Sequence, residues 1–255
     1  MSARLLLAVI ALFLPPAFCF SWRASSARVE LAKSELRRAL KENEGRTAAP
    51  AVATIIEKLV ALTAGKVVAS GEALAGASRT LCAPIFEDCL GTNASGEPIY
   101  TLGRMAFNVY EPVALQCAIK NIFQPIGFNT ETGELSYDID IEFTAAPDPS
   151  LPPLKGRMVN HATAAICSEY PNRLLVTFVG GTMRPAEDNE DLLLWKKTFH
   201  RQPRGSDMSE DGRLGYTVLR PMVGYLDVLF IDDELRITRG NRGSIVVVER
   251  FLEKV

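Results

Sequence analysis

The sequence predicts a mainly β (α+β) protein, an antiparallel barrel or sandwich preceded by two N-terminal helices. Two amphipathic stretches with helical spacing stand between residues 29 and 63, and short alternating or β-branched stretches separated by turn residues follow them. Repeated short strands without helices between them favour antiparallel sheets over a βαβ fold. The 255 residues are 47% hydrophobic and 23% charged, which is enough for one domain with a sizeable core.

Residues 1–19 have the anatomy of a secretory signal peptide. Arg4 provides a positive n-region, Leu5 to Leu14 form an apolar h-region, and small residues lead to a cleavage site after Cys19. The apolar run is shorter than the ~20 residues that span a bilayer as a helix. A buried N-terminal core helix is the less favoured alternative. Residues 20–28 contain two arginines, several serines and no acid, which is the composition of a transit peptide.

Residues 29–66 form the predicted helical lead-in. An apolar stripe at helical spacing runs through residues 29–43, and a second runs through residues 51–63. Gly45 and Gly65 follow the two helices, at the position where glycine commonly ends a helix. The polar faces bear charges of both signs, which favours packing against the sheet over binding to a membrane surface.

The clearest alternation in the chain covers residues 135–143, where every second side chain is apolar. Period two over this length predicts a half-buried antiparallel strand. Its polar positions include Asp138, Asp140 and Glu142. We interpret these acids as part of a solvated outer wall, not as a metal site, because nothing like a calcium-binding loop surrounds them.

Two more predicted strands, residues 157–167 and 174–179, precede a long charged insertion at residues 180–215. Loops of this length are uncommon unless they are disordered or functional. We therefore predict an insertion that is either disordered or a lid over one mouth of the barrel. Its apolar segment, residues 192–195, is predicted as a strand, with a membrane-seeking tip as the alternative.

The C-terminal segment, residues 224–250, is predicted to form three short strands joined by two tight turns. Asp232 and Asp233 centre the first turn, and residues 239–243 supply the glycine and asparagine that positive φ angles require. With this turn centre, Asp227 lies diagonally from Arg236 on one face of the sheet, within reach of it.

This segment resembles the C-terminal signature of the plastid lipid-associated proteins, the plant and algal fibrillins. Leu226-Asp227 and the run from Ile231 to Gly243 carry the resemblance, which is dense over about 27 residues and thinner elsewhere. Charged and turn residues stand there in a fixed register with apolar ones. The resemblance implies a lipocalin-like antiparallel β-barrel over residues 67–255, with the helical lead-in before it.

Residues 76–84 occupy the place of the first strand of that family. The family strand carries a tryptophan that normally plugs one end of a lipocalin-type barrel, and Ser78 stands at that position here. Cys82 stands at the position of a tyrosine. The departure implies that another side chain fills this end or that the barrel is more open.

Together with the signature, the N-terminal segments favour a plastid (chloroplast) destination through a signal peptide plus a transit peptide. Phe20, directly after the predicted cleavage site, resembles the bipartite presequence of algae with secondary plastids. Plain secretion uses the same h-region, so a secreted protein is the alternative.

No pattern for catalysis, a metal or a cofactor stands out in the sequence. The histidines are His161, within a predicted strand, and His200, within the charged insertion. A nucleophile elbow, a phosphate-binding loop and zinc spacing are lacking, so we predict no enzyme, no metal and no cofactor. Cys82 and Cys89 could form a disulfide, but we favour buried free thiols. The net charge of −2 and the pI near 5.8 give no general attraction to nucleic acid.

The charged and turn residues of the signature form the candidate site. They are Asp227, Asp232, Arg236, Arg239, Gly240 and Gly243. In a structural role, an arginine–carboxylate pair pins the strand register and closes the barrel end. In a functional role, the same groups hold the polar head of a ligand whose apolar tail fills the barrel. We favour the structural role and keep ligand binding as the alternative.

The resemblance implies non-catalytic binding or organisation of plastid lipids or isoprenoids, such as carotenoids, prenylquinones or glycerolipids. The partner would be a hydrophobic small molecule or lipid, at thylakoids or at a plastoglobule surface. A barrel of about eight strands encloses room for one small ligand. The alternatives are a secreted or lumenal lipocalin-type carrier, an isoprenoid- or lipid-modifying enzyme on the same barrel, and a purely structural coat protein.

Overall fold

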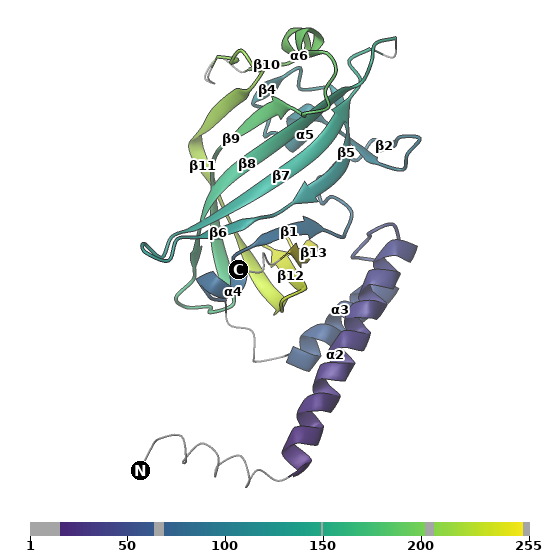
Figure 1. The fold of residues 1–255 in the computed structure, drawn as a ribbon, viewed down its shortest axis with the longest axis vertical. Helices are drawn as coiled ribbons and strands as arrows, with labels where there is room; N and C mark the ends of the chain where they lie inside the picture. Colours follow the sequence, from purple (N-terminus) through teal and green to yellow (C-terminus); the bar gives the residue numbers. More distant parts are fainter. Residues whose placement is uncertain (1–15, 64–68, 149, 202–206, 252–255) are drawn as a thin grey trace.

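The computed structural model describes residues 16–63, 69–148, 150–201 and 207–251 (Figure 1). Most of the predicted signal peptide therefore lies outside the described residues. None of the helices within the described ranges is long and apolar enough to cross a membrane.

Eight antiparallel strands of the described residues form a closed barrel (Figure 1). Around the ring they follow the order β1 (Ala77–Thr80), β13 (Ile245–Phe251), β12 (Leu235–Gly240), β11 (Leu214–Ile231), β9 (Arg173–Pro185), β8 (Leu154–Ile166), β7 (Leu135–Ala145) and β5 (Gln116–Phe123). The pairing of Arg79 with Phe123 joins β1 to β5 and closes the ring. The predicted barrel is therefore confirmed, and the sandwich alternative is wrong.

Short strands extend this sheet and flank it. β2 (Gly91–Thr92) and β3 (Pro98–Thr101) continue from β5, and β6 (Ile126–Phe128) pairs with β7. A separate pair consists of β4 (Tyr110–Glu111) and β10 (His200–Arg201).

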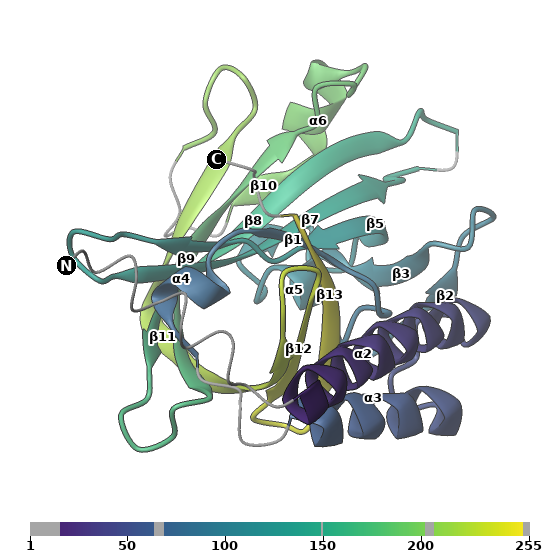
Figure 2. The ribbon, with the colours of Figure 1, turned by 60° about the horizontal axis from the view of Figure 1, so that its bottom comes forward.

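The N-terminal helices α2 (Pro16–Glu42) and α3 (Pro50–Thr63) lie alongside β12 and β13 on the outside of the barrel (Figure 2). Leu36 and Leu59 are buried there in one cluster with Ile237 and Val247. The predicted packing of the helices against the sheet is therefore confirmed. α3 has the predicted extent, whereas α2 begins earlier than predicted and includes residues 20–28.

Side chains that face into the barrel form two clusters. The cluster at the upper end in Figure 1 includes side chains from α5 (Leu102–Met105) and α6 (Leu192–Thr198), with Trp195 and Tyr110 fully buried. The cluster at the lower end lies beside α4 (Gly71–Leu74) and contains Tyr137 and Val176. Ile139 packs against both clusters, so it marks the boundary between them.

The charged segment 180–215 is more regular than predicted. β9 continues to Pro185 and β11 begins at Leu214, with α6 and β10 between them. The predicted strand at residues 192–195 is wrong, because this segment begins helix α6. The carboxylate of Asp191 caps that helix by accepting a hydrogen bond from Leu194 N at 2.7 Å. Trp195 points inward from α6, which covers the upper end of the barrel (Figure 1).

The hairpin between β11 and β12 turns one residue later than predicted. Asp232 N donates a hydrogen bond to Leu235 O at 3.0 Å, so Asp233 and Glu234 centre the turn. The cause is the side chain of Asp232. Its Oδ1 accepts hydrogen bonds from the main-chain amides of Glu234 and Leu235, two and three residues later.

The later turn alone would leave Asp227 and Arg236 on one face, because moving a turn by one residue shifts each pairing by two positions. A β-bulge between Val228 and Phe230 changes this arrangement. Arg236 pairs with Ile231, and Asp227 pairs with Arg239, with a one-residue shift between them. Asp227 consequently faces the outer wall while Arg236 faces the interior. The predicted contact between these two residues is wrong.

Candidate functional site

Arg236 lies inside the barrel. In β12, Leu235 and Ile237 pack against the helices, and strand alternation turns Arg236 to the interior, where only 2% of its surface is exposed. Its Nη2 donates hydrogen bonds to Gln124 O at 3.1 Å and to Ser78 Oγ at 3.3 Å. Both acceptors are neutral, and among the described residues this guanidinium has no carboxylate partner.

No carboxylate of the described residues compensates the charge of Arg236. Burial lowers the pKa of Arg236 to about 10, an effect that Tyr137 opposes and Arg250 reinforces. The guanidinium is nevertheless charged at neutral pH, because this pKa is well above 7. An isolated buried charge is costly unless a partner compensates it. The interior therefore holds a cation that lacks a counter-ion within the described chain.

Arg250 is a second cation at the lower end of the barrel. It is 9% exposed and donates hydrogen bonds to the main-chain oxygens of Asp232, Ala73 and Ala75. Burial lowers the pKa of Arg250, and the carboxylates of Asp233 and Asp232 oppose this effect. Because its main partners are carbonyls, Arg250 adds positive potential near Arg236.

Neutral polar side chains surround Arg236. Ser78 Oγ donates to Gln124 O at 2.7 Å, and Tyr137 OH donates to Gln124 Oε1 at 3.1 Å. Thr80 lies on the same face of β1 as Ser78, and its buried hydroxyl has no hydrogen-bond partner in the described part of the chain. Strand register places Thr80 and Arg236 on either side of Val248. An unused hydroxyl therefore lies on the same inner face as Arg236, two strands away from it.

The apolar wall of the interior retains accessible surface. Ile139 and Phe178 project inward, because Tyr137 and Val176, two residues before them on the same strand faces, are buried in the lower cluster. Both Ile139 and Phe178 are nevertheless only partly buried. The barrel thus combines an accessible apolar wall with a buried cation.

The structure places four of the predicted site residues away from this interior. Asp227 lies on the outer wall, where Arg173 donates two hydrogen bonds to its carboxylate, of 2.7 and 3.1 Å. Arg239 is exposed. Gly240 and Gly243 belong to the turn before β13, and of these two only Gly243 has the positive φ angle, +84°, that favours glycine.

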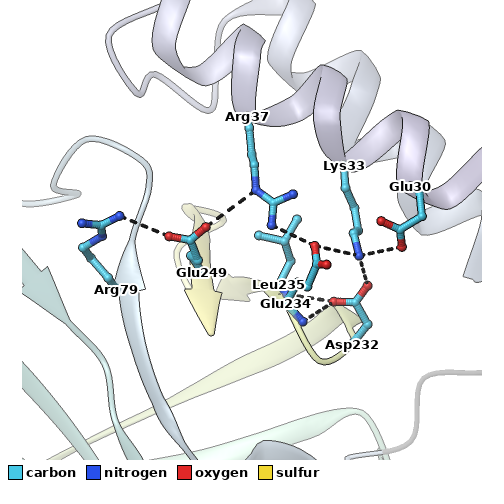
Figure 3. A network of polar contacts seen from close by, with 8 residues as sticks. All are labelled: Glu30, Lys33, Arg37, Arg79, Asp232, Glu234, Leu235 and Glu249. Atoms are coloured by element: carbon cyan, nitrogen blue, oxygen red, sulfur yellow. Dashed lines mark hydrogen bonds and ion pairs between the residues drawn. The ribbon is translucent and has the colours of Figure 1, made fainter. Parts of the chain in front are cut away.

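Asp232 attaches the barrel to helix α2 (Figure 3). Its Oδ2 lies 2.9 Å from the Nζ of Lys33, which is 2% exposed and also contacts Glu30 at 2.8 Å and Glu234 at 3.1 Å. Burial alone would lower the pKa of Lys33, but hydrogen bonds to these three carboxylates raise it overall. Asp232 therefore has a structural role in docking the helix.

The carboxylates of β7 lie on the outer wall, but Asp140 is only 6% exposed, so the predicted solvation is wrong for this residue. Asp140 forms an ion pair with Arg157, and Asp138 Oδ1 lies 3.0 Å from His161 Nδ1. Within the described residues, no group of three or more His, Cys, Asp and Glu side chains is arranged to hold a metal.

The cysteines form no disulfide among the described residues. Cys82 and Cys89 are both free, and Cys82 is buried as predicted. Cys89 is exposed, which corrects the prediction that both thiols are buried.

A closed eight-stranded barrel with a partly accessible apolar interior is typical of carriers of small hydrophobic molecules. The family model PAP_fibrillin, which describes the plastid lipid-associated proteins or fibrillins, matches residues 99–249 of this chain. The chain belongs to this family, as the C-terminal signature predicts. The family indicates a plastid lipid-associated, non-catalytic role. No curated protein and no solved structure matches the chain.

Sequence reasoning named Arg236, and it named Ser78 at one end of the barrel, but it missed Gln124 and Arg250. Gln124 stands in a stretch of short strands and loops without a clear period, so no local signal identifies it. Arg250 follows four consecutive apolar residues, 245–248, which have no period, so the local pattern does not tell which face of the strand it occupies.

Proposed function

We propose that this protein binds a plastid lipid or isoprenoid inside its barrel and organises it at thylakoids or plastoglobules without turnover. The candidate classes are carotenoids, prenylquinones and glycerolipids. The accessible apolar surface of Ile139 and Phe178 inside the closed barrel carries the proposal, because concave apolar sites are those that hydrophobic ligands fill. Membership of the plastid lipid-associated family supports the ligand class.

Mass spectrometry of lipids that co-purify with the full chain from its native organelle tests this proposal. We expect one lipid class in stoichiometric amount. Ile139→Trp adds a ring inside the barrel and is expected to release the lipid. Val223→Trp adds the same ring on the outer wall, where Val223 is 71% exposed, and is expected to retain it. A wild-type protein without lipid, or equal retention by both variants, would contradict binding inside the barrel.

The proposed location is the plastid. A fluorescent protein fused to the C-terminus of the full chain, with its N-terminal segments intact, is expected to accumulate there. Accumulation outside the cell or in the secretory lumen would instead favour the secreted carrier, and it would leave the binding proposal standing.

A further inference from the structure

We infer that Arg236 binds the carboxylate head of a ligand whose apolar chain occupies the barrel, so that the natural ligand is a fatty-acid-like amphiphile. This inference rests on the proposed function: it keeps a lipid inside the barrel but replaces the three candidate classes with a lipid that carries a free carboxylate. Three independent features of the described residues support it: the uncompensated charge, the unused hydrogen-bond donors and the apolar surface next to them.

The charge of the interior favours an anion. Arg236 is almost fully buried, and Arg250 lies near enough to affect it electrostatically. Neither guanidinium has an ion pair with a carboxylate in the described residues, since their hydrogen bonds go to main-chain oxygens and to the Ser78 hydroxyl. A buried cation without a partner is unfavourable, so a bound anion would offset a cost that the folded protein otherwise bears.

The hydrogen-bonding capacity fits a carboxylate. All the hydrogen bonds of Arg236 to described residues use Nη2, which leaves Nε and Nη1 available. The planar guanidinium presents its donors as a fork that matches the two oxygens of a carboxylate. The Thr80 hydroxyl, which is buried and has no partner in the described chain, offers one more donor across β13.

The apolar surface begins next to the charge. Ile231, the register partner of Arg236, packs against the lower cluster, as do Ile139 and Phe178 farther along the interior. A ligand with its head at Arg236 would therefore place its chain against the wall that retains accessible surface. A carotenoid or an uncharged glycerolipid has no acid group with which to compensate Arg236.

Binding of a fluorescent long-chain fatty acid and of its methyl ester to the delipidated full chain tests the inference. The two probes share the same tail, so their difference isolates the head group. We expect the acid to bind about tenfold or more tightly than the ester, as for a charge-assisted, bidentate hydrogen bond. Arg236→Gln is expected to abolish this preference, so that acid and ester bind with similar affinity. Arg239→Gln, which removes an exposed arginine from the same strand, is expected to keep the preference.

The outcomes separate this inference from the proposed function. Equal affinity for acid and ester, or a preference that survives Arg236→Gln, overturns the head-group site but leaves lipid binding intact. Absence of binding for both probes overturns the head-group site, and the lipid that co-purifies with the chain then decides whether the proposed function stands. If Arg236→Gln fails to fold, the comparison of acid with ester in the wild type decides whether the head-group site exists. Thr80→Val then provides the second test, because it is expected to reduce the preference for the acid several-fold.

Discussion

The Nζ of Lys33 lies 2.9 Å from Oδ2 of Asp232, although 199 positions separate the two residues in the chain. Lys33 belongs to helix α2, and Asp232 belongs to the turn between β11 and β12 (Figure 3). The acidic residues of the C-terminal signature therefore hold the N-terminal helix on the barrel. This relationship gives Asp232 and Glu234 a structural role, whereas Arg236, in the same signature, faces the interior.

Lys33→Met is expected to destabilise the protein by about 1–3 kcal/mol, because it removes hydrogen bonds between a buried cation and three carboxylates. Urea unfolding followed by circular dichroism measures the change. Lys41→Met removes an exposed lysine from the same helix and serves as the control, with little expected effect. Equal stability of the two variants would contradict the docking role of Lys33.

The effect of Lys33→Met is expected to depend on pH. Hydrogen bonds from Lys33 and Arg37 hold the pKa of Glu234 below its ordinary value of 4.5. A carboxyl group with a lowered folded-state pKa contributes stability above its unfolded-state pKa and loses it as the pH falls through the folded-state value. The difference between wild type and Lys33→Met should therefore be full at neutral pH and shrink below about pH 4. Urea titrations at a series of pH values measure it, and a difference that grows on acidification would refute this account.

Trp195→Ala is expected to cost about 3–5 kcal/mol, because the indole is fully buried under the upper end of the barrel. It also removes the hydrogen bond from Nε1 to Gly212 O, which measures 2.8 Å. Leu193→Ala, in the same helix, changes a side chain that is 65% exposed and should alter stability by less than about 0.5 kcal/mol. Thermal unfolding of both variants checks the prediction. A Trp195→Ala protein that unfolds at the same temperature as Leu193→Ala would contradict it.

Gly243→Ala is expected to cost about 1 kcal/mol, because the φ angle of +84° strains any residue with a Cβ atom. The added methyl group would meet no atom within 4 Å, so the cost comes from the backbone alone. Gly224→Ala is the matched control, since its nearest atom would lie 3.8 Å away and its φ is not positive. Comparable midpoints of urea unfolding for the two variants would show that the turn does not require glycine.

Asp227→Asn is expected to lower stability slightly without changing ligand binding. The substitution weakens the two hydrogen bonds from Arg173 on the outer wall, on the opposite face of the sheet from Arg236. Urea unfolding and the fatty-acid binding assay measure the two properties separately. If Asp227→Asn abolishes fatty-acid binding, Asp227 has a functional role in spite of its outward position. The same conclusion would follow if the purified protein turned over a lipid and the variant did not.

Local sequence patterns predicted those helices and strands whose periodicity can be recognised within a short stretch of residues. Alternation over residues 135–143 gave β7, and helical spacing gave α3, because each pattern reports which side chains share a face. Residues 192–195 were assigned wrongly because four apolar residues have no period. The capping carboxylate of Asp191 and the burial of Trp195 decide that they form a helix.

The candidate site was harder to predict than the fold, because its members come from distant parts of the chain. Ser78, Gln124 and Arg236 meet only through the closure of the barrel between β1 and β5. The register of the last hairpin also depended on the hydrogen bonds of one side chain, that of Asp232. A β-bulge between Val228 and Phe230, which no local pattern indicates, puts Asp227 on the opposite face from Arg236.

The sequence by itself determined that this chain folds its alternating segments into an antiparallel β structure with two amphipathic helices, and that its C-terminal signature places it among the plastid lipid-associated proteins. Only the tertiary structure decided which face of each strand is enclosed. Strand alternation divides side chains between two faces, but ring closure and helix packing make one face of β12 the interior and cover the other. For that reason Arg236 is buried without a counter-ion in the described chain, while Asp232, four residues earlier, binds a helix outside.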